Sequence, residues 1–330
     1  MNIDNLLIVG NGFDLNLGLK TQYKDFIGDD YCSSKEFNKY AKSNYELANG
    51  IKRYSKGELW SGIENDLAEI SLEVHKIREE ERDYGRKHAF DNPSDIQSFS
   101  SLLNEPETGR EYDLLNLSRH NRFLDQYVNL KAALCSYLCS ICDNSRLNEL
   151  SEAYKLVIGL INQSENTYIV DFNYTSSIAS IMNEFYIKRY RHDASEFLTE
   201  KLIKIHGGHE DKNIVFGVQD DVLINPSHTF LRKGVSPHLW DKMLVSDLMS
   251  MTRKEIHIFG HSLGASDHTQ FRDYFTDFSG NKKDRAKLSI YHHGTPCFYS
   301  LFKEIDALTG NQLTRFKASH DLSMVNIKND

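Results

Sequence analysis

Short apolar segments, each ending at a glycine or a polar residue, constrain the fold of this chain more than any other feature of its sequence. They are typical of strands that are covered on both faces. Five strands are predicted, at 5–9, 168–172, 202–205, 255–259 and 287–291, and residues 214–216 are a candidate for a short sixth. Helical patterns separate several of them. This alternation predicts an α/β fold with a Rossmann-like, mainly parallel sheet that is flanked by helices.

A long interval separates the first two predicted strands, and most of it has the period of helices. Apolar residues recur at helical spacing over residues 59–77 and again over residues 123–141. The polar stretch between them, residues 84–119, is predicted to be a loop. We therefore expect residues 30–165 to form a large helical insertion after the first strand, within one α/β domain that spans residues 1–330.

Composition excludes several classes of protein. The 330 residues are 40% hydrophobic and carry a formal net charge of −8, which is typical of a soluble globular protein and disfavours nucleic acid as a direct ligand. No segment approaches the ~18 apolar residues of a membrane-spanning helix. Because the first apolar run is also too short for a signal peptide, we expect no membrane association and a cytoplasmic location. The odd number of cysteines, five, favours buried thiols over disulfides or a metal cluster.

The first predicted strand runs directly into a Gly-x-Gly turn, Gly10-Asn11-Gly12, which Phe13 and Asp14 follow. Glycines let the backbone approach a ligand closely, and free amides at the start of a helix attract phosphate. The third glycine of a dinucleotide-binding fingerprint is absent, because Leu15 occupies its position. The turn therefore has two interpretations, a phosphate-binding loop and a tight connection between strand and helix.

Three later strands also end in polar or glycine-rich segments, at 171–175, 204–208 and 259–264, with Asp267 just beyond the last. Open α/β sheets bind ligands at the carboxyl ends of their strands, so parallel neighbours would bring all four clusters to one crevice. Asn173 and His206 are the candidate catalytic residues, since an amide can orient a substrate and an imidazole can accept a proton. The alternative is that Asn173 caps a helix and His206 binds a loop.

The segment Gly260-His261-Ser262-Leu263-Gly264 also matches the nucleophile elbow of serine hydrolases. Only 68 residues follow Ser262, and they hold one clear strand, which is too little for the acid, the histidine and the sheet of such an enzyme. We therefore predict that Ser262 is not a nucleophile. Nine of the 14 histidines lie between His206 and His293, but at separate strand ends, so we expect no metal site.

Taken in order, these segments resemble the bacterial abortive-infection AbiH family. The resemblance rests on residues 10–14 continuing into 18–26, on 172–175, on 205–207, and on 259–264 with Asp267. Trp60 and Glu64 also match a tryptophan and a glutamate at the start of a helix in that family. The strand ends are more distantly similar to those of sirtuin-like NAD-binding domains, with Thr175 in place of an aspartate and Asp14 near an absent serine.

The resemblance implies an antiphage effector that binds a nucleotide and, as an NAD+ glycohydrolase, hydrolyses the N-glycosidic bond of NAD. NAD is then the expected substrate, and no tightly bound cofactor or metal is needed. Asn173 and His206 would be catalytic. The residues expected to contact the nucleotide are Gly10, Asn11, Gly12, Phe13, Asp14, Thr21, Tyr174, Gly207, Gly260, His261, Ser262 and Asp267.

Within this interpretation each part of the site has an expected role. The amides of Gly10, Asn11 and Gly12 hold the pyrophosphate, and Asp267 or Ser262 contacts a ribose. Asn173 orients the nicotinamide ribose or a water, and His206 is the general base. Glu64 is expected to reach toward the site, the alternative being a solvated charge.

Two other functions stay open. One is a nucleotide-sensing or partner-dependent nuclease module of a defence system without NADase activity, and the other is a serine hydrolase. A homo-oligomer or a partner defence protein is compatible with each of them.

Overall fold

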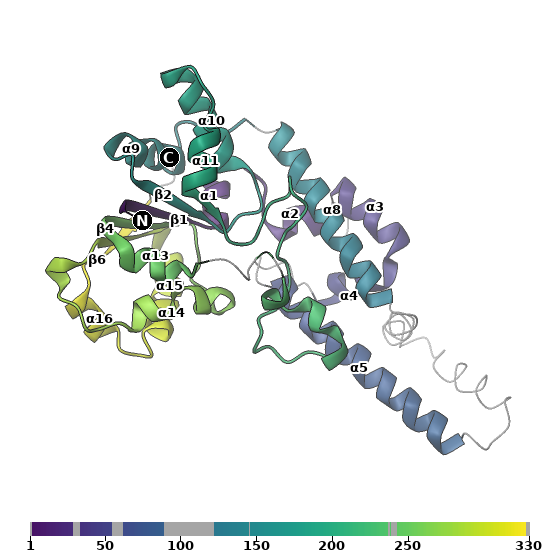
Figure 1. Cartoon of the computed structure of the whole chain (residues 1–330). Coiled ribbons are helices and arrows are strands. Elements are labelled where there is room, and N and C mark those ends of the chain that lie inside the picture. Colours follow the sequence, from purple (N-terminus) through teal and green to yellow (C-terminus); the bar gives the residue numbers. More distant parts are fainter. Residues whose placement is uncertain are drawn as a thin grey trace. The chain divides into compact units, whose positions relative to one another are not determined.

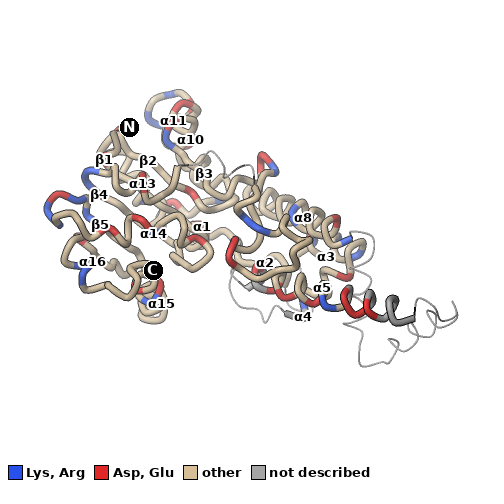
Figure 2. Tube along the Cα trace, turned by 60° about the horizontal axis from the view of Figure 1, so that its bottom comes forward, with Lys and Arg blue, Asp and Glu red and all other residues tan. Residues whose placement is uncertain are grey.

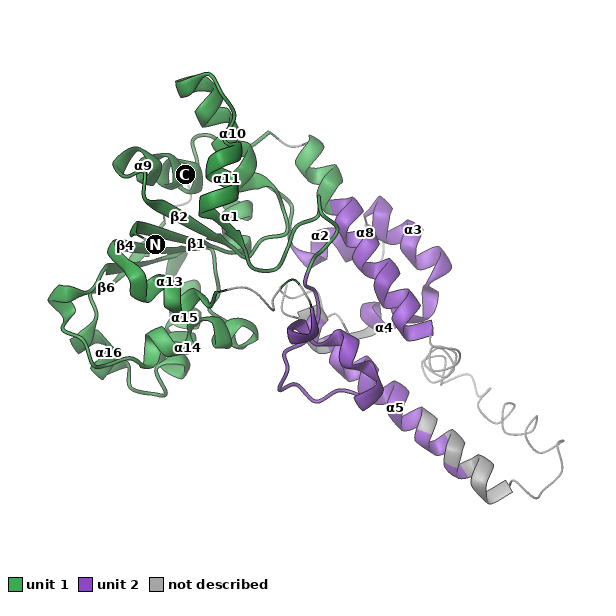
Figure 3. Ribbon diagram, in the orientation of Figure 1, with its two compact units in different colours: residues 1–21, 138–214, 238–330 green, residues 22–137, 215–237 purple. Residues whose placement is uncertain are grey.

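The computed structural model of the chain describes residues 2–28, 34–54, 62–88, 122–144, 146–236, 238 and 243–327. The chain forms two compact units (Figure 3). Unit 1 comprises residues 1–21, 138–214 and 238–330, and unit 2 comprises residues 22–137 and 215–237. The expected single domain with an insertion at 30–165 stays a prediction.

Unit 1 is built on a six-stranded sheet in which every pair of neighbours is parallel (Figure 1). The strands are β1 (Ile3–Val9), β2 (Thr167–Asp171), β3 (Leu202–Lys204), β4 (Thr252–Phe259), β5 (Lys287–His292) and β6 (Leu322–Asn326). Their order, β3-β2-β1-β4-β5-β6, is that of a Rossmann-type sheet, in which the direction of winding changes between β1 and β4. The predicted α/β, Rossmann-like fold is confirmed.

The structure corrects the strand prediction at the sixth strand. Residues 214–216 are buried but form no strand, and beyond them Val218 makes only an isolated bridge with Arg232. The sixth strand is β6, which forms the edge of the sheet beside β5 and is half-buried over most of its length. An edge strand of this kind lacks the apolar run that marks strands covered on both faces, so its sequence gives a weaker signal.

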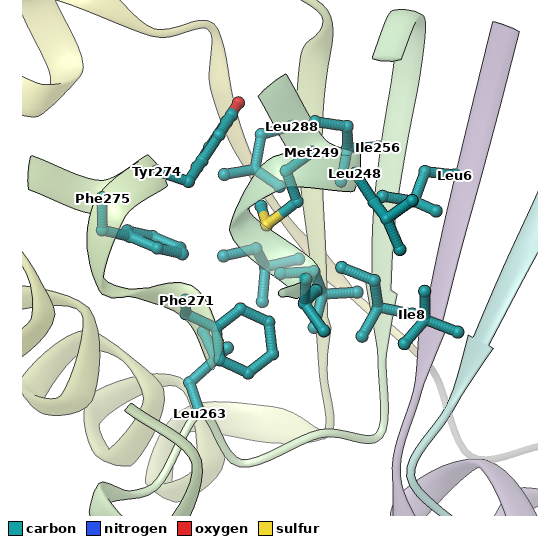
Figure 4. Packing of buried hydrophobic residues seen from close by; sticks show 14 of the residues in the cluster. Leu6, Ile8, Leu248, Met249, Ile256, Leu263, Phe271, Tyr274, Phe275 and Leu288 are labelled. Carbon is teal, nitrogen blue, oxygen red and sulfur yellow. The ribbon is translucent and has the colours of Figure 1, made fainter. Parts of the chain in front are cut away.

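Two hydrophobic clusters cover the two faces of the sheet. Alternate residues of β1 belong to different clusters: Leu6 and Ile8 to one, Leu7 and Val9 to the other. Figure 4 shows Leu6 and Ile8 packed with residues of β4, α13 and α14. This alternation is the period of two expected of a strand, and it explains why the strand reads as a continuous apolar run.

Different helices supply the two clusters. The first takes side chains from α13 (Val245–Met251), α14 (His268–Thr276), α15 (Gly294–Leu308) and α16 (Leu313–Ser319). The second takes side chains from α1 (Asn11–Asn16), α9 (Glu152–Gln163), α10 (Ser177–Tyr190) and α11 (Ser195–Lys201). Short 3-10 turns, η4 (Ala265–Asp267) and η5 (Lys282–Asp284), lie before α14 and β5.

Unit 2 is helical in the described residues. Its helices are α2 (Tyr23–Ile27), α3 (Lys35–Ser43), α4 (Tyr45–Tyr54), α5 (Gly62–His88) and the part of α8 (Arg122–Asn144) up to residue 137, with the 3-10 turns η2 (Pro226–Leu231) and η3 (Lys233–Val235). Of the predicted loop at 84–119, residues 84–88 belong to α5 and the rest lies outside the described residues.

The segment 215–237 is bound to the helices of unit 2 by buried hydrogen bonds. The hydroxyl of Tyr127 donates to the carbonyl of Phe216. Ser71 Oγ accepts from the amide of Asn225 at 3.0 Å and lies 2.9 Å from Nδ1 of His228. Within the described residues, every helix of the chain is too short or too polar to cross a membrane.

Candidate functional site

The four polar clusters predicted from the sequence follow four neighbouring strands. β1 pairs with β2 on one side and with β4 on the other, and β2 pairs with β3. In the register, Val9 lies opposite both Asp171 and Phe259, so these strands end at the same level. The prediction that they are parallel neighbours whose carboxyl ends share one edge of the sheet is confirmed.

At this edge two histidines converge on one carboxylate. Nε2 of His206, which follows β3, lies 3.1 Å from Oδ1 of Asp267. Nε2 of His261, which follows β4, lies 3.6 Å from Oδ2 of the same residue. All three residues are at least nine-tenths buried. The described residues contain no group of three or more His, Cys, Asp and Glu arranged to hold a metal ion.

The backbone determines which nitrogen of His261 carries the proton. The amide of Leu263 donates to Nδ1 of His261 at 3.0 Å, so the ring of the neutral histidine has its N–H at Nε2, toward Asp267. For His206, an N–H at Nε2 likewise satisfies Asp267. Nδ1 of His206 is then the nitrogen that can accept a proton.

Phe172 packs against both imidazoles. Its ring meets His206 edge to face at 5.2 Å and His261 at 4.3 Å, and it stacks on Phe271 at 5.7 Å. An aromatic environment lowers the local dielectric constant, which strengthens the interaction of the histidines with Asp267.

The turn after β2 holds Asn173, whose side-chain nitrogen is buried without a hydrogen-bond partner in the described part of the chain. The residue is only 6% exposed. A buried donor of this kind is rare in proteins and calls for a ligand or a water. It therefore marks a position at which an acceptor from outside the protein can bind.

The backbone of this turn is fixed from several directions. The amide of Asn173 donates to Asp171 Oδ1 at 2.8 Å. The backbone amide and Nδ1 of His209 both donate to the carbonyl of Tyr174, at 2.9 and 2.8 Å. Lys204 Nζ donates to the carbonyl of Thr175. Asn173 is therefore presented on a rigid turn, as a positioned binding or catalytic group must be.

A buried carboxylate network lies behind the turn. Asp14 accepts hydrogen bonds from Thr175 Oγ1 at 2.7 Å and from Ser177 Oγ at 2.6 Å. Burial and the nearby charge of Asp171 raise the pKa of Asp14 to about 7. Burial also raises the pKa of Asp171, although Lys204 Nζ, 2.9 Å away, opposes this shift.

This network gives Asp14 partners within the protein. The residue is 1% exposed and both of its oxygens accept hydrogen bonds from the protein, and its expected contact with a nucleotide stays a prediction. Asp14 and Thr175, the two departures from the sirtuin-like pattern, are hydrogen-bonded to each other. Asp171 and Lys204 are absent from the predicted site residues. The sequence feature that could have identified them is a single acidic and a single basic residue, each at the end of an apolar strand.

The glycines at the ends of β1 and β4 allow two turns to pack backbone to backbone. The amide of Gly10 donates to the carbonyl of Phe259 at 3.1 Å, and that of Gly12 donates to the carbonyl of Gly260 at 2.8 Å. A Cβ atom on Gly12 would lie 2.7 Å from Cα of Gly260. The amides of Gly10 and Gly12 thus already donate within the protein, and the expectation that the amides of Gly10, Asn11 and Gly12 hold a pyrophosphate stays a prediction.

Neighbouring residues of the predicted set also have structural roles. Phe13 is fully buried against Phe259, and its expected contact with the nucleotide stays a prediction. Thr21 Oγ1 donates to Oδ1 of Asn11. Gly207 has a φ of 73°, and a Cβ atom there would lie 2.4 Å from the carbonyl oxygen of Asn213.

The turn that contains Ser262 differs from a nucleophile elbow. Ser262 is exposed, and its Oγ accepts from the amide of Gly264 at 3.2 Å. A positive φ occurs at Gly260 and Leu263 but not at Ser262. The 3-10 turn η4 precedes α14, whereas a helix begins directly after the serine of an elbow. This geometry agrees with the prediction that Ser262 is not a nucleophile.

Glu64 lies in unit 2 and is paired there. Its Oε1 is 2.9 Å from Nζ of Lys233, and both side chains are about nine-tenths buried. The alternative of a solvated charge is therefore wrong. The expected approach of Glu64 to Asn173 and His206 stays a prediction, and Trp60 lies outside the described residues.

Comparison with known families gives one result. The model of the family described as "Bacteriophage abortive infection AbiH" matches residues 6–289. This range includes β2, β3 and β4 entirely and every residue of the site at the carboxyl edge of the sheet. A comparison with curated proteins found no match.

Proposed function

The chain belongs to the bacteriophage abortive-infection AbiH family, and on that premise we propose that it limits phage infection by hydrolysing NAD. Family membership indicates the antiphage role. The reaction and its substrate are our proposal, and the site at the carboxyl edge of the sheet supports them.

One observation carries the proposal: a buried His206–Asp267 pair and the side-chain nitrogen of Asn173, which has no partner among the described residues, all follow strands at the carboxyl edge of a Rossmann-type sheet. The carboxyl edge of such a sheet, where the winding direction changes, is the place at which nucleotides bind. An imidazole held by a carboxylate is a general base that works near neutral pH.

The proposed step replaces one bond to the ribose by another. A water molecule attacks C1′ as the bond from C1′ to the nicotinamide nitrogen breaks, and neutral nicotinamide leaves with the electron pair of that bond. Nδ1 of His206 accepts the proton of the water, and Asp267 stabilises the resulting imidazolium. The amide of Asn173 donates to the ribose or to the water, which positions them for the reaction. The products are ADP-ribose, nicotinamide and a proton.

The experiment follows nicotinamide release from NAD by the purified protein and the loss of NAD from infected cells. The parent protein releases nicotinamide and protects cells. His206→Ala and Asp267→Asn each lower the rate by about 100-fold or more, because the base is removed or its ring is no longer held in the required tautomer. His192→Ala, at an exposed histidine at the end of α10, is the matched control and retains activity.

Two results would overturn the proposal. One is that NAD persists in protected cells. The other is that His206→Ala and Asp267→Asn protect cells as well as the parent. A fluorophosphonate probe tests the serine-hydrolase alternative, and we expect it not to label Ser262.

A further inference from the structure

We infer that His261 is a positioning residue that holds the carboxylate of Asp267 in place for His206. The kinetic test of this inference rests on the proposed function. The contacts that support it lie within the protein and do not depend on any substrate. These contacts run in series from the backbone of Leu263 through His261 and Asp267 to His206.

The ring of His261 is held by a backbone hydrogen bond and by two aromatic side chains. The amide of Leu263 fixes Nδ1 as an acceptor, and this amide is presented by a residue with a φ of 54° that is itself fully buried. Such a left-handed conformation is unusual for a leucine. Phe172 and Phe271 pack against the ring, with centroids at 4.3 and 5.2 Å. The N–H at Nε2 is therefore on the side of the ring that faces Asp267, whose Oδ2 lies 3.6 Å away.

Asp267 has donors on both oxygens. Oδ1 faces His206, and Oδ2 faces His261 and accepts from Ser266 Oγ at 3.2 Å. A carboxylate held from one side could rotate about its terminal bond, whereas one held on both oxygens keeps Oδ1 directed at His206. The N–H dipole of His261, with Nε2 at 3.6 Å from Oδ2, also attracts the negative charge of Asp267 and so weakens its interaction with His206.

Other charged groups surround the contacts between His261, Asp267 and His206, and the substitutions in the test leave these groups unchanged. Asp171, paired with Lys204, is close enough for His206 to lower its pKa. On the far side of the turn, Nε2 of His268 lies 3.1 Å from the carbonyl of Leu263 and 3.3 Å from Glu304.

Two substitutions separate the two functions of the His261 ring. In His261→Gln the side-chain nitrogen reaches the position of Nε2, so the donor to Asp267 is kept. In His261→Asn the shorter amide can accept from Leu263 but cannot reach Asp267. The two variants have similar polarity, and each keeps one of the two interactions of the ring: His261→Gln keeps the donor to Asp267, and His261→Asn keeps the acceptor for Leu263.

The kinetic test compares kcat, KM and the pH–rate profile of NAD hydrolysis. We expect His261→Asn to lower kcat by about 10-fold with KM little changed, since residues behind a catalytic group commonly contribute 10- to 100-fold. We also expect the acidic limb of its profile to move to higher pH, because Asp267 then directs more charge to His206. His261→Gln restores most of the loss. A purely structural role for His261 would change thermal stability without moving the profile.

The same inference is tested without activity by NMR of the protein labelled with 15N-histidine. The 15N shifts should show both His206 and His261 with the proton on Nε2, and the titration of His206 should move to higher pH in His261→Asn but not in His261→Gln. Ser266→Ala removes the second donor to Oδ2 of Asp267 and leaves the His261 ring intact. It should move the titration of His206 in the same direction, but by less.

The outcomes distinguish the two proposals. If the titration of His206 is the same in His261→Asn, His261→Gln and the parent, the positioning role is wrong, whatever the activity of the protein. If the titration responds as expected but the parent releases no nicotinamide, the positioning role stands and the proposed reaction is wrong.

Discussion

Asn173 has a buried side-chain nitrogen without a hydrogen-bond partner in the described part of the chain, and it gives a prediction that separates function from stability. Replacing a buried polar group normally costs stability because its partner is left unpaired. The side-chain nitrogen of Asn173 has no partner in the described residues, so Asn173→Ala should leave the melting temperature unchanged or slightly raised. NAD cleavage should fall by about 100-fold, since the donor to the substrate is gone.

The measurement is thermal unfolding alongside nicotinamide release for Asn173→Ala. A large drop in melting temperature with activity retained would show that Asn173 serves the fold, for example as a helix cap. Asn166→Ala, at the turn before β2, provides a comparison at an asparagine outside the site.

Asp14 gives a prediction about pH. In the folded protein its pKa is raised to about 7, whereas its ordinary value is 3.8. Between about pH 4 and pH 7 Asp14 is therefore protonated in the folded state and ionised in the unfolded state. Its contribution to the free energy of unfolding falls as the pH rises through this range. One pKa unit corresponds to about 1.4 kcal/mol, so the contribution of Asp14 amounts to at most about 4 kcal/mol.

We expect Asp14→Asn, which is neutral at every pH, to lose less stability than the parent between pH 5 and pH 8 in urea unfolding. Asp211→Asn, at an exposed acid, is the control and should keep the pH dependence of the parent. An unchanged pH dependence in Asp14→Asn would mean that Asp14 is already ionised in the folded protein at pH 5.

At the scale of elements, the close packing of the turns after β1 and β4 gives a third prediction. Gly260 has a φ of 69°, and a Cβ atom there would lie 2.1 Å from the backbone nitrogen of Phe13. Gly310 has a similar φ of 62° with no atom within 4 Å of the same position. Gly310→Ala therefore carries the conformational cost alone, and Gly260→Ala carries that cost together with the clash.

We expect Gly260→Ala to lower the free energy of unfolding by about 1–3 kcal/mol more than Gly310→Ala, the usual range for overpacking. Chemical denaturation of both variants measures the difference. Equal effects would mean that the two turns can move apart, and would remove the structural explanation for the glycines.

The strands and the edge at which they end were predictable because each signal is local. The run from Leu6 to Val9 is apolar on both faces, and the rule that parallel strands share a carboxyl edge then brings His206 and Asp267 into one region. β6 was not predicted because Ser323 and Asn326 interrupt its sequence, so it has no continuous apolar run. Which hydrogen bonds each residue already makes is not local: whether Gly12 donates to a phosphate or to Gly260 depends on how two turns separated by more than 200 residues pack together.

At the scale of the whole molecule, charge distinguishes the proposed enzyme from the nuclease alternative. The chain carries a net charge of −8, and Lys and Arg are interspersed with Asp and Glu along its described part (Figure 2). Binding to nucleic acid depends on the release of counterions by clustered cations, which this distribution does not favour.

We expect the protein to elute from a heparin column below about 0.15 M salt, where charge interactions are screened beyond about 8 Å. The isolated protein should also leave double- and single-stranded DNA unbound at that ionic strength. Retention to distinctly higher salt would favour a module that acts on nucleic acid.

The central position of β1 has a consequence for how the protein is made. β1 is the earliest of the six strands to leave the ribosome, yet its partners β2 and β4 begin only at Thr167 and Thr252. At typical translation rates, roughly 10–30 s pass before β2 is even synthesised. During that time an apolar strand with two unpaired edges is available to pair with other chains. We therefore expect slower translation between β1 and β2, or the loss of chaperones that bind the nascent chain there, to lower the fraction of this protein that reaches its folded state.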